Sequence, residues 1–101
     1  MEIDEHNKDI CEFSELFKLL SNPVRLCIVG KLCKHETLNV SYFVNCLDAS
    51  QSSISQHLQK LKANGVIDCK KDGLTVNYYI KDEKAKRIVE TICSIRSMDD
   101  E

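Results

Sequence analysis

The amino-acid sequence predicts a small, mainly α-helical domain that carries one β-hairpin. Apolar residues recur at spacings of three and four over most of the chain, and the period turns strand-like only between residues 66 and 80. The 101 residues leave room for one modest core, without repeats or an interdomain linker. We therefore expect a single domain over residues 9–97, between a flexible acidic N-terminus (residues 1–8) and an acidic tail (residues 98–101).

The first two helices are each predicted from an apolar stripe. The first stripe consists of Ile10, Phe13, Leu16, Phe17 and Leu20. It ends at Asn22-Pro23, where Asn is a favoured N-cap and Pro fits the first helical turn, so a second helix is expected to begin here. The buried stripe of that helix consists of Leu26, Ile28, Val29 and Leu32.

A short third helix is predicted after a polar break at residues 34–37. Its apolar residues are Val40, Phe43, Val44 and Leu47. Asn39 stands near its start, and Asp48-Ala49 makes a brief turn after it. The third helix is therefore followed closely by another element.

That element is a fourth helix capped by Ser50. Its apolar stripe, at positions i, i+4 and i+7, consists of Ile54, Leu58 and Leu61. Asn64-Gly65 ends the helix, because glycine readily adopts the left-handed conformation of a helix C-terminus.

A β-hairpin and a final helix complete the order ααα-α-ββ-α. Residues 66–70 and 75–80 are strand-like, and Asp72-Gly73 between them is a hairpin turn signal. The last helix is expected from about Asp82, with an apolar stripe of Ala85, Ile88, Val89, Ile92 and Ile95.

The third and fourth helices have the dimensions of a helix-turn-helix, and the hairpin directly after them fits a wing. The exposed sides of the fourth helix are rich in Gln and Ser, which hydrogen-bond adenine edges and phosphates. The hairpin adds two lysines that can contact phosphate. We expect double-stranded DNA to be contacted by Ser50, Gln51, Ser52, Ser53, Ser55, Gln56, His57, Gln59, Lys60, Lys62, Lys70 and Lys71. The alternatives are a merely polar helix face and a solvated turn.

The charge distribution permits DNA binding although the formal net charge is −2. Residues 1–15 hold six carboxylates and one lysine, whereas residues 50–80 hold four lysines and two carboxylates. No apolar run approaches the roughly 18 residues of a membrane span, and the polar N-terminus is no secretory signal. We expect a cytoplasmic protein without a membrane partner.

In its predicted helices and hairpin, the chain resembles the ArsR/SmtB family of bacterial and archaeal repressors. The resemblance covers about residues 13–95 and rests on LFKLLSNPVRLCIVGKL, ASQSSISQHLQKLKANGVIDCKKDG and VNYYI. The family's recognition helix reads S-Q-x-x-[VI]-S-x-H-L-x-x-L, which is matched by Ser50, Gln51, Ile54, Ser55, His57, Leu58 and Leu61. The resemblance implies a winged helix-turn-helix repressor that dimerises through its first and last helices and leaves its operator when an inducer binds.

The metal sites known in the family are missing from this sequence. Arsenic and cadmium sensors resemble E-L-C-[VA]-C-D at the start of the third helix, where this chain has TLNVSY and neither cysteine. Zinc sensors use Asp and His pairs on the last helix. Asp82 fits the first of these positions, but Lys84 and Ile95 stand where histidines are required. The metal ligands, if any, are unknown from sequence.

Six cysteines leave thiol chemistry as a route for induction. Sulfide and redox sensors of the family pair cysteines at positions that align with Gly30 and Ser97, but Cys27 and Cys93 lie about one helical turn earlier. We hypothesise a displaced Cys27–Cys93 switch that responds to an oxidant or reactive sulfur, with Cys11 as a further candidate. A thiophilic metal or metalloid is the alternative inducer. The core is expected to contain Cys33, Cys46 and Cys69.

The alternatives to a repressor belong to two other functional classes. A winged helix can serve as an inducer-independent regulator or a protein-interaction module, because fold does not dictate function. An enzyme is not expected, since the sequence has no Cys/His/Asp constellation, phosphate loop or paired carboxylates. No cofactor is required by any of these interpretations.

Overall fold

The computed structural model describes residues 3–96, with the side chain of Arg96 left out. Five helices and three strands follow one another in this part of the chain, and the predicted order of helices and hairpin is confirmed. The first helix, α1 (Lys8–Leu20), begins one residue inside the segment that was predicted to be flexible. Ser97 and the predicted tail lie outside the described residues.

Local capping chemistry fixes the starts of the second, third and fourth helices as the sequence predicted. The Asn22 side chain accepts hydrogen bonds from the backbone N–H groups of Val24 and Arg25, and α2 (Pro23–Lys34) begins there. Asn39 caps α3 (Val40–Cys46) in the same way. Ser50 caps α4 (Gln51–Ala63), and Gly65 follows that helix with φ +78°.

The sheet differs from the predicted hairpin by one additional strand. Strands β2 (Ile67–Asp72) and β3 (Thr75–Ile80) pair antiparallel, and the short β1 (Leu38–Asn39) pairs with the other edge of β3 to give the order β1-β3-β2. Two residues make a strand too short to show a period, so the sequence did not reveal β1. The turn is also shifted, because Asp72 pairs with Thr75 and leaves Gly73-Leu74 as its two central residues.

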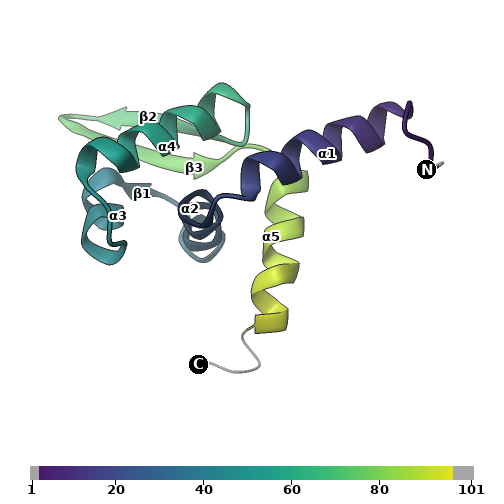
Figure 1. The fold of residues 1–101 in the computed structure, drawn as a ribbon. Helices are drawn as coiled ribbons and strands as arrows, with labels where there is room; N and C mark the ends of the chain where they lie inside the picture. Colours follow the sequence, from purple (N-terminus) through teal and green to yellow (C-terminus); the bar gives the residue numbers. More distant parts are fainter. Residues whose placement is uncertain (1–2, 97–101) are drawn as a thin grey trace.

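Helix α2 is the centre of the packing. It contacts α1, α4, α5 (Glu83–Arg96) and β3, and its residues Ile28 and Val29 have no exposed surface. In Figure 1 the sheet and α4 lie on one side of the molecule, while α1 extends away from it and α5 runs down beside α2. No helix within residues 3–96 is long and apolar enough to cross a membrane.

The apolar stripes of the outer helices are only partly covered within one chain. On α1, Leu16, Leu19 and Leu20 are buried, but Phe17 is 53% exposed. On α5, Ala85 and Val89 are buried, but Ile92 and Ile95 are 40% and 67% exposed. The predicted stripes are therefore present, and each continues onto the surface.

Two leucines test how far the core controls stability. We expect Leu58→Ala, in α4 with no exposed surface, to lower the free energy of unfolding by about 2–5 kcal/mol through lost burial and a cavity. The matched change Leu74→Ala, at the fully exposed hairpin turn, should change it by less than about 0.5 kcal/mol. Urea unfolding at one fixed protein concentration measures both, and equal effects would contradict this packing.

Candidate nucleic-acid interface

Helix α4 presents a polar face to solvent because its apolar face is fully occupied. Ile54, Leu58 and Leu61 are completely buried in the core cluster. The exposed polar side chains of α4 are Gln51, Ser52, Ser55, Gln56, Gln59, Lys60 and Lys62. A helix of these dimensions fits the major groove, where Gln and Ser side chains can hydrogen-bond base edges.

The first turn of α4 is organised by Ser50. Its side-chain oxygen accepts a hydrogen bond from the backbone N–H of Ser53 at 3.1 Å, and its carbonyl accepts one from the N–H of Ile54 at 2.9 Å. Ser50 therefore fixes where the helix begins, and Ser53 is half-buried beside it. The remaining amides of a helix N-terminus favour an anion such as a phosphate.

The hairpin carries the two predicted lysines on its exposed part. Lys70 and Lys71 both lie on β2 and are exposed, close to the turn at Gly73. The Lys70 ammonium lies 5.7 Å from the centroid of the Tyr79 ring on the paired strand. This cation–π contact restricts the positions that the ammonium group occupies. The hairpin, which follows α4 in sequence, therefore adds two exposed positive charges to those of the α4 face.

Among the residues expected to contact DNA, His57 is the one whose side chain hydrogen-bonds a residue of α2 in the described part of the chain. It is half-buried, and its Nδ1 lies 3.3 Å from Nη1 of Arg25 on α2. Burial lowers the pKa of His57 below its ordinary value, and the neighbouring cations Arg25 and Lys60 lower the pKa further. Its spacing from Ile54, at i+3, puts it at the edge of the buried stripe, a sequence signal that it turns toward the core.

The candidate thiols Cys27 and Cys93 line one cavity between α2 and α5, with a volume of about 370 Å³. Cys27 is exposed and Cys93 is half-buried. Gly30 lines the same cavity, and a Cβ atom at that position would lie 3.6 Å from Sγ of Cys93. The structure therefore brings the hypothesised pair to one site as free thiols.

The three cysteines predicted to be core residues have different environments. Cys33 and Cys69 are half-buried, but Cys46 is exposed, so the core prediction is wrong for Cys46. Cys46 is the last residue of α3, where the apolar period no longer dictates burial. Burial raises the pKa of the Cys33 thiol to about 11, with a further contribution from Cys93 and Glu90. Cys33 Sγ contacts the carbonyl oxygen of Lys86 at 3.8 Å.

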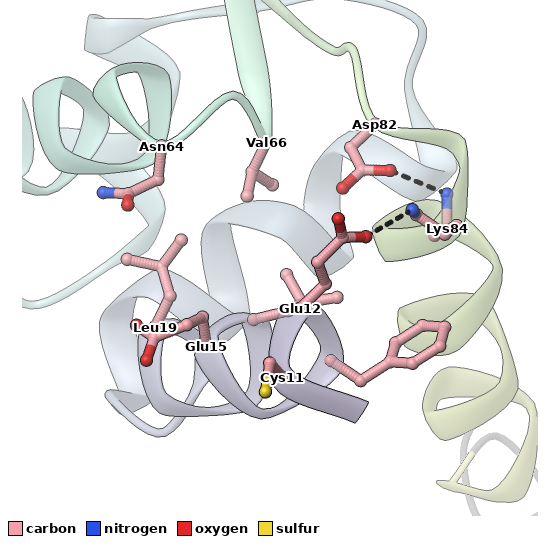
Figure 2. Close-up of a pocket in the computed structure, with 10 residues that line it drawn as sticks. Cys11, Glu12, Glu15, Leu19, Asn64, Val66, Asp82 and Lys84 are labelled. Carbon is pink, nitrogen blue, oxygen red and sulfur yellow. Dashed lines mark hydrogen bonds and ion pairs between the residues drawn. The ribbon is translucent and has the colours of Figure 1, made fainter. Parts of the chain in front are cut away.

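Cys11 lies in a separate cavity between α1 and the start of α5. Figure 2 shows the Glu12 carboxylate there turned toward Lys84, and the two groups are 3.5 Å apart. Asp82 accepts a hydrogen bond from the backbone N–H of Lys84 at 2.9 Å, as a helix cap does. Within this chain Cys11 is therefore not part of the Cys27–Cys93 cavity.

The residues at the α5 positions where zinc sensors of the family carry ligands make other contacts within this chain. Lys84 is ion-paired with Glu12 and lies over the Phe13 ring, and Asp82 is used as a cap. Among residues 3–96, no group of three His, Cys, Asp or Glu side chains is arranged to hold a metal ion.

The amino-acid sequence is similar to those of known regulatory proteins. Residues 22–68 match the sequence pattern described as "Bacterial regulatory protein, arsR family". The chain is 42% identical over 84 residues to the cadmium resistance transcriptional regulatory protein CadC of Listeria innocua, which covers 83% of this chain and 71% of CadC. It is 36% identical to the transcriptional repressor PagR of Bacillus anthracis, with 82% and 83% of the two chains covered.

The fold has a close counterpart among solved structures. Reduced HlyU from Vibrio cholerae superposes with a TM-score of 0.82 at 30% identity, over 87% of this chain and 92% of that chain. HlyU of the same organism is named a transcriptional activator. These relatives are regulators of transcription, and they include both a repressor and an activator.

The unequal burial of the thiols predicts unequal reactivity. We expect iodoacetamide at pH 8 to modify Cys33 at least about tenfold more slowly than Cys46, because a pKa of about 11 leaves roughly one thiol in a thousand as thiolate. The rate at Cys33 should rise with pH up to about 11. Peptide mass spectrometry measures both rates, and equal rates at pH 8 would show that Cys33 is not protected.

Proposed function

This chain belongs to the ArsR family of bacterial regulatory proteins, and we propose that it is a homodimeric repressor that an inducer releases from its operator. As a member of this family it is a DNA-binding transcriptional regulator and not an enzyme, as the sequence predicted. The proposal concerns the direction of regulation, the dimer, the DNA contacts and the inducer.

The observation that carries the proposed DNA contact is the outward Gln/Ser face of α4. Its buried residues Ile54, Leu58 and Leu61 fix the rotation of the helix, so Ser55 and Gln56 point away from the core. In a two-fold symmetric dimer two such helices enter successive major grooves about 34 Å apart. Repression is favoured by the likeness to PagR, which is named a repressor.

The proposed dimer rests on the uncovered parts of the α1 and α5 stripes. Phe17, Ile92 and Ile95 are large apolar residues with exposed surface on these two helices. Pairing the outer helices of two copies would remove this surface from water, which favours association by about 25 cal/mol for each Å² of apolar area. It would also leave α4 and the hairpin free to bind DNA (Figure 1).

The proposed inducer acts through the Cys27–Cys93 cavity. Both thiols line it, and its wall is formed by α2 and α5, the central helix and an outer helix. A two-electron oxidant would take two protons and two electrons from the thiols and leave a disulfide between them. A soft metal ion is the alternative, suggested by the likeness to CadC, a cadmium resistance regulator.

We expect Gln56→Ala and Ser55→Ala to weaken specific DNA binding by about 1–3 kcal/mol each, because each removes a base or phosphate partner. The probe is the duplex that the wild-type protein selects from random-sequence DNA, and fluorescence anisotropy gives the affinity. The dimer, measured by sedimentation, should be unchanged. Unchanged affinity in both variants would remove α4 from the interface.

The thiol switch makes a separate prediction. Treating the reduced protein with diamide should lower affinity for the selected duplex about 5–150-fold, the range of typical allosteric coupling, as two hydrogen atoms are lost from the intact mass. Cys27→Ser and Cys93→Ser should each abolish the response, whereas Cys46→Ser, at an exposed thiol, should preserve it. Equally strong binding of the duplex by the reduced and the oxidised protein would contradict the thiol-switch hypothesis. A screen of metal ions would then be the next step.

A further inference from the structure

Arg25 joins three helices through its hydrogen bonds. It stands in the first turn of α2, where its backbone N–H donates to the Asn22 side chain at 3.1 Å. Its Nε donates to the carbonyl oxygen of Leu19, near the end of α1, at 2.7 Å. Its Nη1 lies 3.3 Å from Nδ1 of His57 on α4. One half-buried side chain therefore reaches from an outer helix to the recognition helix.

The direction of the Arg25–His57 hydrogen bond follows from the chemistry of the two groups. A guanidinium has only donors, so Nδ1 of His57 must accept, and the ring must be neutral with its proton on Nε2. The charged groups that act on His57 are Arg25 from α2 and Lys60 from α4, and both disfavour a second positive charge. Burial acts in the same direction, and the pKa of His57 is lowered.

The two ends of the link are fixed by their neighbours. Leu19 is 7% exposed and belongs to the core, so its carbonyl oxygen is held in place. His57 precedes Leu58, which has no exposed surface, and follows Gln56, which is exposed. A contact at His57 therefore adds a polar restraint to the rotation of α4 that the buried Ile54, Leu58 and Leu61 fix, next to the exposed Gln56.

We propose that Arg25 is a positioning residue for DNA recognition, which sets α4 against the end of α1 by donating a hydrogen bond to His57. His57 then serves as the acceptor of this bond, with its Nδ1 turned to the protein and away from DNA. The proposal rests on the proposed function, since it concerns the same recognition helix.

The first test separates positioning from direct contact with phosphate. Arg25→Gln should lower affinity for the selected duplex about tenfold, while affinity for a scrambled duplex of equal composition stays unchanged. The matched control Lys34→Gln removes a cation from an exposed position of the same helix and should leave both affinities unchanged. Arg25→Lys, which keeps the charge and loses the planar fork, should show an intermediate loss.

The salt dependence of DNA binding distinguishes a phosphate contact at Arg25 from a positioning role. A phosphate contact at Arg25 would lower affinity for both duplexes equally and make the slope of log K against log[salt] shallower by about one. That result, or an unchanged affinity in Arg25→Gln, would overturn the proposal. Thermal unfolding shows whether each variant is folded. If Arg25→Gln is unfolded, the affinities for the two duplexes are compared in Arg25→Lys instead.

The second test needs no DNA. The ¹⁵N resonances of the His57 ring should show the Nε2–H tautomer at neutral pH, and Arg25→Gln should raise the pKa of His57, because a neighbouring cation is removed. An Nδ1–H tautomer in the wild-type protein would overturn the proposal. A wild-type protein that selects no duplex would overturn the proposed function and any role in recognition, while the resonances would still decide whether the Arg25–His57 contact exists.

The pH dependence of DNA binding has a sign that distinguishes the two roles of His57. If His57 is an acceptor for Arg25, protonation places two cations together, so affinity for the selected duplex should fall as the pH drops from about 6.5 through the lowered pKa. His57→Asn carries its Oδ1 where the ring carries Nδ1, and should keep the affinity at neutral pH but lose this pH dependence. A gain in affinity on acidification that disappears in His57→Asn would identify a phosphate contact and overturn the proposal.

Discussion

The burial of three residues on α4 is the constraint on which the interface depends. Ile54, Leu58 and Leu61 have no exposed surface, and their spacing of four and three residues aligns them along one side of the helix. Turning α4 by one residue would expose a leucine and bury a glutamine without a partner, which costs free energy on both counts. The side of α4 proposed to face DNA is therefore the side that the core excludes.

Local chemistry carried most of the fold prediction. Asn22, Ser50 and Gly65 each act within a few residues of their own position, through a cap or a left-handed conformation, so sequence spacing is enough to locate them. Strand β1 escaped prediction because its two residues are ordered by a partner about forty positions away. The exposure of Cys46 was missed for a related reason, since a period does not show where a helix end meets solvent.

The candidate site likewise has one part that the sequence predicts and one part that it does not. The polar face of α4 follows from periodicity, and the exposure of Gln51, Gln56 and Gln59 agrees with it. Periodicity puts His57 at the edge of the buried stripe, but it does not reveal the hydrogen-bond partner, because Arg25 lies 32 residues earlier and reaches His57 through the tertiary fold. The family motif includes His57 within the recognition helix, and only the three-dimensional arrangement shows that its Nδ1 lies against Arg25 of α2.

Both proposed controls act through α2, and this shared element explains how they can be coupled. The Cys27–Cys93 cavity lies between α2 and α5, whereas Arg25 links the start of α2 to α1 and α4. A bond formed across the cavity can weaken DNA binding only if it favours an arrangement of α4 that binds DNA less well. Cys27 is two residues from Arg25 on the same helix, so a shift of α2 at the cavity would also move the backbone that carries Arg25. Under this arrangement, removing the Arg25–His57 link should uncouple the thiols from DNA binding, as well as weaken the binding itself.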